Sequence, residues 1–318
     1  MKLLILNEHD VDELLTMREC IGVMEEALKS LANGEVVNPL RNLVRGTAAP
    51  GILGMMPAWR GGDTPVYGLK EVCVFPGNPS RGLDTHLGAV LLHSGETGEL
   101  LAVVNAAAVT AIRTAAVSAV ATRLLAREDA SVLAIIGAGV QARTHLEAIP
   151  LVRNINDVRI YSRTRAKAEA LGRAVDSVEE AVRGADIIVT ATSSKDAVLR
   201  REWIAPGAHI NAVGSSIAAA RELDAATVAA ASLFVDRRES TVNESGDYLF
   251  ALREGAISGP EHIRAEIGEI LTGRAKGRTS RDELTLFKSL GLAIEDLSAA
   301  AFLFEKASRL GRGTVVGF

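Results

Sequence analysis

The chain has 318 residues, of which 48% are apolar and 23% are charged, and its formal net charge at pH 7 is −4. This length allows two domains with substantial cores, and the small net charge gives no basic face that would indicate a nucleic-acid partner. No apolar run reaches the roughly 18–20 residues that span a bilayer, and the apolar N-terminus turns acidic too early for a secretory signal, so we expect a cytoplasmic protein without a membrane partner.

The first third of the chain predicts one helix followed by several short strands. Apolar residues at alternating spacings of four and three predict an amphipathic helix from Met17 to Leu31, which Asn33-Gly34 ends. The β-rich segments that follow are broken by Gly and Pro and indicate an antiparallel sheet or open barrel. They are Arg41–Val44, Gly51–Met56, Tyr67–Phe75, Thr85–Leu92 and Leu100–Val104, and the alanine-rich helical stretch Ala106–Ala126 follows them.

From Ser131, strands alternate with helices, which predicts parallel βαβ units and a doubly wound sheet of Rossmann type. The apolar helix Gly291–Leu310 is expected to return to the first domain or to a subunit interface. The fold class is therefore α/β, with an α+β domain over residues 1–116, completed by 292–318, and a Rossmann-type domain over residues 117–291. The expected Rossmann strands are Val132–Ile136, Val158–Tyr161, Asp186–Ala191, His209–Val213 and Leu233–Val235.

The segment Ser131–Ala142 is an apolar strand that ends in Gly-Ala-Gly-Val-Gln-Ala, followed by a helical pattern. This is the form of a turn that binds a dinucleotide pyrophosphate at a helix N-terminus. Gly137 allows the tight turn, Gly139 lets the backbone approach the phosphates, and Ala142 keeps the helix close to the strand. The predicted cofactor contacts here are Gly137, Ala138, Gly139, Val140 and Gln141.

The end of the next strand indicates which nicotinamide cofactor is preferred. NAD sites carry an acidic residue there for the ribose 2′-hydroxyl, whereas this chain has Tyr161-Ser162-Arg163-Thr164-Arg165. A guanidinium and two hydroxyls suit a 2′-phosphate, so Ser162, Arg163 and Thr164 predict NADP(H), with NAD(H) as the alternative. Arg163 and Arg165 could instead be solvated charges at the start of a helix.

The cysteines and histidines do not predict a metal centre. Cys20 and Cys73 match no metal or redox spacing, so we expect two buried, reduced thiols. The six histidines lack the paired spacing of metal ligands.

Several further motifs follow one another along the chain: Pro39-Leu40-Arg41, Met56-Pro57, Gly68-Leu69-Lys70, Thr110–Ser118, Asn211–Gly214, Glu222-Leu223-Asp224 and Phe287–Asp296. With these and the glycine turn, the chain resembles the ornithine cyclodeaminase/μ-crystallin family over nearly its whole length. The similarity is greatest to the μ-crystallin-like ketimine reductases. The resemblance implies a homodimer, a substrate-binding and dimerising domain beside the Rossmann domain, and hydride transfer at the α-carbon of an amino or imino acid.

Three cations on separate elements are predicted to bind the substrate: Arg41, Lys70 and Arg113. An α-imino acid presents a carboxylate that Arg binds bidentately and Lys neutralises as a point charge. The resemblance also implies that Lys70 takes part in proton transfer and that Met56 and His86 lie beside the substrate. Lys70 and Arg113 could instead have purely structural partners.

Asp224 is predicted as the second catalytic residue, because a carboxylate beside an iminium stabilises that cation and can relay a proton. Alternatively, Asp224 caps the helix that begins near Ala225. Lys288 is expected either to contact a cofactor phosphate or to pair with Glu295 or Asp296. The remaining predicted cofactor contacts are Thr114, Thr190, Ala191, Thr192, Val213, Gly214, Ser289 and Gly291, and the basic residues predicted to form a solvated loop are Arg274, Lys276, Arg278 and Arg281.

Two departures from the family pattern have consequences. Cyclodeaminases carry a Glu two residues before the Met-Pro pair, where this chain has Gly54, so the terminal ammonium of ornithine would lose a carboxylate partner. The strand usual after the helix Arg165–Val175 is reduced to Ala174-Val175, so we expect a shortened or missing edge strand.

These features together predict an NADPH-dependent reductase of α-imino acids, in particular cyclic ketimines such as Δ1-pyrroline-2-carboxylate or Δ1-piperideine-2-carboxylate. The alternatives are an ornithine cyclodeaminase, an alanine dehydrogenase-like L-amino-acid dehydrogenase and a non-catalytic NADPH-dependent binding protein. The set Arg41, Lys70, Arg113 and Asp224 favours catalysis, because a binding protein has no need of the aspartate.

Overall fold

The computed structural model describes residues 2–48 and 50–318. The chain divides into two units, of which the first comprises Met1–Arg113 and Leu292–Phe318 and the second comprises Thr114–Gly291. Helix α3 (Ala106–Leu125) begins in the first unit and ends in the second. The α/β fold class predicted from the sequence is confirmed.

The first unit is built on one sheet in the order β15-β1-β7-β6-β5-β4-β2, with β3 paired to β4. Strands β1 and β7 pair in parallel, and the other neighbours are antiparallel. The predicted antiparallel character is thus confirmed, whereas β1 and β15 were not predicted. The strands are β1 (Lys2–Leu6), β2 (Val36–Val37), β3 (Asn42–Arg45), β4 (Ile52–Arg60), β5 (Val66–Val74), β6 (His86–Ser94), β7 (Leu100–Asn105) and β15 (Thr314–Gly317). The helical segments are α1 (Glu8–Leu14), α2 (Met17–Ala32), η1 (Asn78–Arg81) and α11 (Ala293–Leu310).

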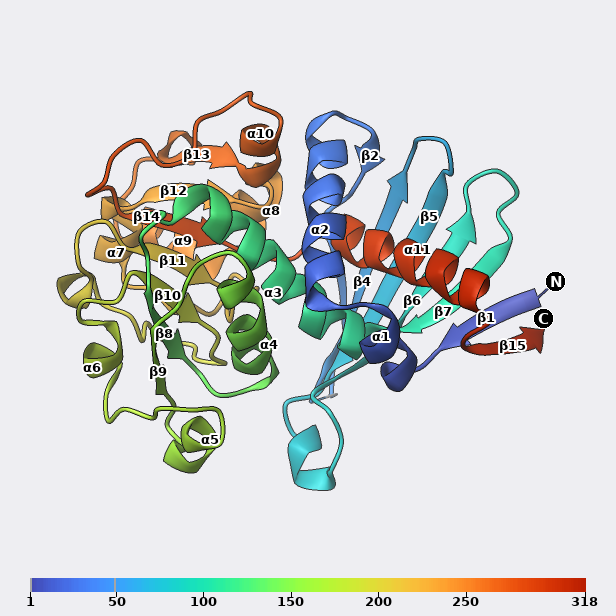
Figure 1. Cartoon of the computed structure of the whole chain (residues 1–318), viewed down its shortest axis with the longest axis horizontal. Coiled ribbons are helices and arrows are strands. Elements are labelled where there is room, and N and C mark those ends of the chain that lie inside the picture. Colours follow the sequence, from blue (N-terminus) through green and yellow to red (C-terminus); the bar gives the residue numbers. More distant parts are fainter. Residues whose placement is uncertain (1, 49) are drawn as a thin grey trace. The chain divides into compact units, whose positions relative to one another are not determined.

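Helices α2 and α11 lie over one face of this sheet (Figure 1). Helix α2 starts with a capping box between Thr16 and Glu19 and ends at Asn33, followed by Gly34 with a φ of 78°, as the sequence predicted. Helix α11 lies so close to β5 that a Cβ on Gly68 would be 2.5 Å from Leu297 Cδ1. The C-terminal helix therefore returns to the first unit, as expected.

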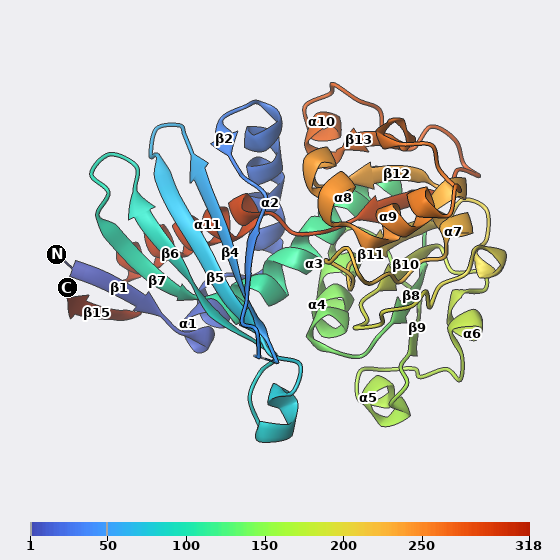
Figure 2. The same ribbon diagram turned by 180° about the vertical axis from the view of Figure 1, so that it is seen from behind.

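No helix of the described residues lies over the opposite face of the same sheet (Figure 2). Side chains alternate along strands, so residues next in sequence to those under α11 point to this face. The strand register aligns one apolar row across it: Pro57, Leu69, Leu91, Val103 and Ile5. We call this surface the helix-free face.

The second unit contains a parallel sheet in the order β13-β12-β14-β11-β10-β8-β9. The predicted doubly wound sheet is therefore confirmed, although β13 and β14 were not predicted. Its strands are β8 (Val132–Ile136), β9 (Asp157–Tyr161), β10 (Ile187–Thr190), β11 (His209–Ala212), β12 (Ser232–Val235), β13 (Ile263–Glu266) and β14 (Thr285–Lys288). Its helices are α4 (Val140–Ala148), α5 (Arg165–Glu169), α6 (Val178–Val182), α7 (Ala225–Ala230), α8 (Arg238–Glu244), α9 (Gly246–Arg253) and α10 (Ile267–Leu271), with 3-10 turns η2 (Ile149–Leu151), η3 (Arg201–Trp203) and η4 (Pro260–His262).

Both faces of this sheet are apolar, as expected for parallel strands covered on two sides. Leu133 and Ile135 of β8 enter one core cluster with Ala142 of α4, whereas Ala134 and Ile136 enter a second cluster on the other face. Within residues 2–48 and 50–318, α3 is the one helix long and apolar enough to cross a membrane, and most of it is buried inside the protein like a core helix.

The predicted loss of an edge strand is confirmed. Beyond β9, the only pairing among the described residues is an isolated parallel bridge between Ile160 and Ala174. This bridge is made by backbone hydrogen bonds. Ile160 N donates to the Arg173 carbonyl oxygen at 2.9 Å, and Val175 N donates to the Ile160 carbonyl oxygen at 3.0 Å.

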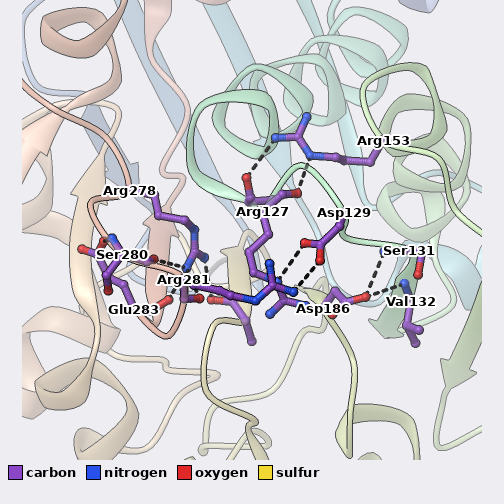
Figure 3. A network of polar contacts seen from close by, with 12 residues as sticks. Arg127, Asp129, Ser131, Val132, Arg153, Asp186, Arg278, Ser280, Arg281 and Glu283 are labelled. Carbon is purple, nitrogen blue, oxygen red and sulfur yellow. Dashed lines mark hydrogen bonds and ion pairs between the residues drawn. The ribbon is translucent and has the colours of Figure 1, made fainter.

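The loop before β14 corrects one prediction. Arg278 is not a solvated charge, because its guanidinium donates hydrogen bonds to the carbonyl oxygens of Leu125, Ala208 and Glu283 at 2.6, 3.2 and 2.5 Å. Figure 3 shows Arg278 in this network, which connects the loop to the amino ends of the parallel strands. Arg281 remains mostly exposed, although it pairs with Asp129.

Candidate cofactor and substrate sites

The glycine turn joins β8 to α4 in the second unit. Gly137 has a φ of 120°, which favours glycine, and a Cβ there would lie 2.3 Å from the Ala191 carbonyl oxygen. A Cβ on Gly139 would meet no described atom within 4 Å, and none of the described side chains caps the N-terminus of α4. The first N–H groups of α4 therefore have no side-chain cap, which is the arrangement that helix N-termini present to a phosphate.

Helix α4 is held in place by a neutral histidine. The ring of His145 is fully buried, with Nδ1 2.6 Å from the Gln141 carbonyl oxygen and Nε2 2.9 Å from Ser118 Oγ of α3. Burial lowers the pKa of His145 to about 4, so the ring is uncharged at neutral pH. Ala142 is also fully buried, as its predicted role in close packing requires.

The other predicted cofactor residues of this unit gather at the carboxyl edge of the sheet. The chain runs from β8 to β9 on one side and to β10 and β11 on the other, and ligands of such sheets bind where the order reverses. Thr190–Thr192 end β10, Val213–Gly214 follow β11, and Ser289 follows β14. Because parallel strands end at the same edge, these three segments lie along the edge of the sheet that carries the glycine turn, and Ala191 packs directly against Gly137.

The two arginines of the loop after β9 have different surroundings. Arg165 is engaged by Glu169 at 2.8 Å and by Asp176. Arg163 is exposed and makes no ion pair with any residue the structure describes. Ser162 Oγ accepts a hydrogen bond from Thr164 N at 3.3 Å, which shapes the loop.

In the first unit, two of the predicted cations meet two carboxylates of α11. Lys70 Nζ lies 3.0 Å from Asp296 Oδ1 and 2.6 Å from Thr110 Oγ1. Arg113 reaches the same Asp296 oxygen with Nε at 3.1 Å and reaches Glu295 with Nη1 at 2.8 Å. All four charged side chains are buried. Buried charges are stable only when they are paired, so the two carboxylates of α11 stabilise the two buried cations.

The electrostatics of this cluster lower the basicity of Lys70. Burial is the largest cause and the Arg113 and Arg41 charges add to it, while Asp296 opposes them, and the pKa of Lys70 falls to about 8. Burial raises the pKa of the neighbouring Cys20 thiol, which is therefore neutral. Lys70 is thus the group in the cluster whose proton is most easily lost near neutral pH.

The remaining predicted substrate residues belong to the same sheet face as Lys70. Met56 pairs with Lys70 across β4 and β5, and Arg41 directly precedes β3, which pairs with β4. His86 begins β6 opposite Val74. Burial and the Lys70 charge lower the pKa of His86.

Asp224 occupies the N-cap of α7. Its Oδ1 accepts hydrogen bonds from Thr227 N at 2.8 Å and Thr227 Oγ1 at 2.5 Å, and its Oδ2 lies 3.3 Å from Arg201 N. The capping alternative is therefore observed, and both oxygens are used structurally. The proton relay predicted for Asp224 stays a prediction.

The structure excludes one of the two alternatives for Lys288, and contact with a cofactor phosphate stays a prediction. Its ammonium lies 3.0 Å from Asp247 Oδ2 and donates to the carbonyl oxygens of Ala212 and Ser215, so it pairs with neither Glu295 nor Asp296. It is buried and belongs to the second unit.

Gly291 and Thr114, which were both predicted to contact the cofactor, are fixed by their surroundings. Gly291 N and Leu290 N donate to Asp236 Oδ2 at 2.8 and 2.6 Å, and Gly291 has a φ of 77°. Thr114 is buried in α3, directly after Arg113.

Sequence reasoning missed the carboxylates that hold both sites. Glu295 and Asp296 were considered only as partners of Lys288, and Glu222 only as part of a motif. Each is fully buried, which a charged residue tolerates only with partners. Among the described residues, no group of His, Cys, Asp and Glu is arranged to hold a metal ion.

A dinucleotide turn on a parallel sheet, together with a buried cation cluster suited to a carboxylate, defines a nicotinamide-dependent oxidoreductase of small acids. The sequence profile of the ornithine cyclodeaminase/mu-crystallin family matches residues 1–310, and the chain belongs to this family.

Relatives and solved structures agree with this assignment. The chain is 39% identical over 307 residues to mouse ketimine reductase mu-crystallin, covering 93% of this chain and 95% of the relative. The structure of Thermococcus litoralis Δ1-pyrroline-2-carboxylate reductase with NADH and L-proline matches with a TM-score of 0.94 and 40% identity, covering 98% of this chain and 99% of that one. An archaeal alanine dehydrogenase dimer with bound NAD matches with a TM-score of 0.94 and 36% identity, covering 100% of both chains.

Proposed function

We propose that this protein reduces cyclic α-imino acids to L-amino acids with NADPH. The observation that carries the proposal is the buried cluster of Lys70 and Arg113 on Asp296, with Arg41 close enough to affect the Lys70 pKa. The reductase and ketimine reductase activities named for two of the relatives support the same reaction.

The cations of the cluster suit a substrate with a carboxylate. Lys70 and Arg113 are buried beside Asp296, and the Arg41 charge is close enough to lower the pKa of Lys70. The planar carboxylate of an imino acid matches a guanidinium, and a lysine neutralises it as a point charge. Holding the carboxylate orients the C=N bond for reaction.

Proton transfer is assigned to Lys70. When bound, the reduced nicotinamide supplies a hydride to the α-carbon, and the electron pair of the C=N bond moves to nitrogen. Lys70 Nζ gives a proton to that nitrogen or holds the imine protonated beforehand. A pKa of about 8 suits this role, because a general acid works best with a pKa near the working pH.

The surroundings of Gly54 favour a substrate with an apolar ring rather than a diamino acid. A Cβ on Gly54 would lie 3.6 Å from the Leu43 and Val72 side chains, which is ordinary packing contact. The third neighbour is the Val72 carbonyl oxygen at 3.7 Å, and the glycine itself offers no carboxylate to a substrate ammonium. An ornithine side chain would lose a partner there.

The function is tested by following NADPH oxidation with Δ1-pyrroline-2-carboxylate, Δ1-piperideine-2-carboxylate, and pyruvate with ammonia. Turnover of the cyclic ketimines supports the proposal. Turnover confined to pyruvate with ammonia would make the protein an alanine dehydrogenase, and ammonia release from ornithine with NAD⁺ would make it a cyclodeaminase. NADPH binding without any turnover would make it a binding protein.

The preference for NADP(H) is part of the proposal. Arg163 follows β9, is exposed and has no described ionic partner, whereas Arg165 is neutralised by carboxylates. We expect Arg163→Ala to weaken NADPH binding by about 10-fold or more and to leave NADH binding within about 2-fold, since a charged hydrogen bond is worth roughly 1.5–3 kcal/mol. Arg165→Ala is the matched control and should affect both cofactors little. Equal losses for both cofactors in Arg163→Ala would contradict the assignment.

A homodimer that forms through the helix-free face completes the proposal. This face presents an apolar row over five strands, together with the exposed Tyr67 and Leu87. Extended apolar patches of this kind mark interfaces in soluble proteins. The related alanine dehydrogenase is described as a dimer, so a second copy of the chain is the partner that we assign to this face.

A further inference from the structure

Glu222 is a fully buried carboxylate whose two oxygens accept four hydrogen bonds. Oε1 accepts from Thr192 N at 2.6 Å and from Thr192 Oγ1 at 2.7 Å. Oε2 accepts from Thr190 Oγ1 at 2.8 Å and from Gly214 N at 2.7 Å. One side chain therefore joins the carboxyl ends of β10 and β11.

A second layer of charge holds Glu222 itself. Asp247 Oδ1 accepts from the backbone N–H groups of Glu222 and Leu223 at 2.8 and 2.9 Å. Lys288 Nζ lies 3.0 Å from Asp247 Oδ2 and donates to Ser215 O at 2.5 Å. The loop after β11 is thus tied to β14 through a buried ion pair.

The segment that Glu222 holds is the one against which the glycine turn packs. A Cβ on Gly137 would lie 2.3 Å from the Ala191 carbonyl oxygen, and a Cβ on Gly214 would lie 2.3 Å from the Thr192 carbonyl oxygen and 2.5 Å from Glu222 Oε1. The three backbones therefore approach at contact distance. A shift of the Ala191–Thr192 segment would change the floor of the cofactor site.

Only an ionised carboxylate accepts from both backbone N–H groups, Thr192 N on one oxygen and Gly214 N on the other. Glutamine has the same size, but its amide NH2 would face one of these two N–H groups, whereas the threonine hydroxyls can turn to accept from it. A buried donor without an acceptor loses its hydrogen bond and its hydration together. Glutamine therefore leaves one backbone N–H without an acceptor.

We propose that Glu222, supported by Asp247 and Lys288, is the positioning residue that sets the ends of β10 and β11 for the part of the cofactor beyond the pyrophosphate. This inference rests on the proposed cofactor site. It makes Glu222 necessary for nicotinamide binding and unnecessary for binding of the adenosine half, which the loop after β9 with Arg163 receives.

The test compares Glu222→Gln with the wild-type protein in direct binding measurements. Dissociation constants are measured for NADPH, by nicotinamide fluorescence, and for adenosine 2′,5′-bisphosphate, by calorimetry, together with the melting temperature. We expect the NADPH constant to rise about 10-fold or more, the size of effect that an unpaired buried donor produces, and the bisphosphate constant to stay within about 2-fold. Should wild-type protein fail to bind NADPH, the proposed function fails, independently of Glu222.

Asp186→Asn is the matched control, because Asp186 precedes the opposite end of the same strand β10. It accepts from Ser131 N and Val132 N at 2.9 and 3.0 Å and pairs with Arg127 (Figure 3). This variant should lower the melting temperature and leave the NADPH constant unchanged. A Glu222→Gln variant that also melts lower with an unchanged NADPH constant would reduce Glu222 to a structural residue and overturn the proposal.

Asp247→Asn serves if Glu222→Gln does not fold. The asparagine oxygen can still accept from Glu222 N and Leu223 N, while the charge opposite Lys288 is lost. We expect about a 3-fold weaker NADPH affinity with unchanged bisphosphate affinity, a smaller loss because only one interaction with a charged group weakens. Unchanged NADPH affinity in a folded Asp247→Asn protein would likewise overturn the proposal.

Discussion

Lys70 shows how a few neighbours decide the chemistry of one side chain. Its burial lowers the pKa, and the Asp296 carboxylate at 3.0 Å prevents a further fall. Without that carboxylate, the pKa of a lysine in this position would fall further, as happens to buried lysines without a counterion. The carboxylate of α11 therefore keeps the proton on Lys70.

This balance predicts the pH dependence of reduction. The protonated form of Lys70 is the donor, so kcat/KM should fall as pH rises through about 8. Asp296→Asn removes the charge that raises the pKa of Lys70, and we expect the alkaline limb of the profile to move down by about one pH unit. The measurement is kcat/KM against pH with Δ1-pyrroline-2-carboxylate.

Glu295→Gln is the control for that profile. Glu295 pairs with Arg113, and the carboxylate that raises the pKa of Lys70 is Asp296, so the variant should raise KM and leave the alkaline limb in place. If both variants keep the wild-type limb, Lys70 is not the titrating group. Melting temperatures are needed for both, because breaking a buried ion pair costs about 3–5 kcal/mol.

At the scale of elements, helix α7 decides how Asp224 is interpreted. Asparagine caps a helix about as well as aspartate, so Asp224→Asn should keep the melting temperature, whereas Asp224→Ala should lose about 1 kcal/mol of stability. If Asp224 relays a proton, kcat of Asp224→Asn should fall by orders of magnitude with unchanged stability and cofactor affinity. A kcat near the wild-type value would leave Asp224 as the cap alone, whose oxygens bind the α7 terminus and Arg201 N.

The elements that local patterns could predict are those with a signal inside one short segment. The turn at Gly137 and the helix over 17–32 carry such signals, and so do the cations of the substrate site. Strands β1 and β15 do not, because each becomes a strand by pairing with a segment at the other end of the chain. Strand β14 is a four-residue buried run without alternation, which a pattern does not distinguish from a loop or a helix.

The carboxylates of the two sites were beyond prediction for the same reason. Asp296 meets Lys70 across 226 positions, and Glu222 meets Thr190 across 32. The motif Glu222-Leu223-Asp224 could be assigned a function, but nothing local to it shows which carboxylate caps a helix and which holds two strand ends. That distinction depends on the tertiary structure.

At the scale of the whole molecule, the helix-free face predicts the oligomeric state. We expect the wild-type protein to have twice its chain mass of 33.5 kDa in light scattering. Leu91→Lys places a charge in the middle of the apolar row and should give a monomer, since burying an unpaired charge is costly. Leu252→Lys, at an exposed position on α9, is the control and should remain dimeric. A Leu91→Lys protein that stays dimeric would assign the interface to another surface.

The return of α11 to the first unit determines the order in which the protein can be completed during its synthesis. Domains fold as units while the chain emerges from the ribosome, and the second unit has all its residues once Gly291 has been made. At that moment the first unit still lacks α11 and β15, so the part of its sheet under α11 is uncovered, and Lys70 and Arg113 lack the carboxylates of α11. The segment synthesised first is thus finished last, and a nascent chain arrested before Ala293 would expose the strands that α11 covers and leave Lys70 and Arg113 without Glu295 and Asp296.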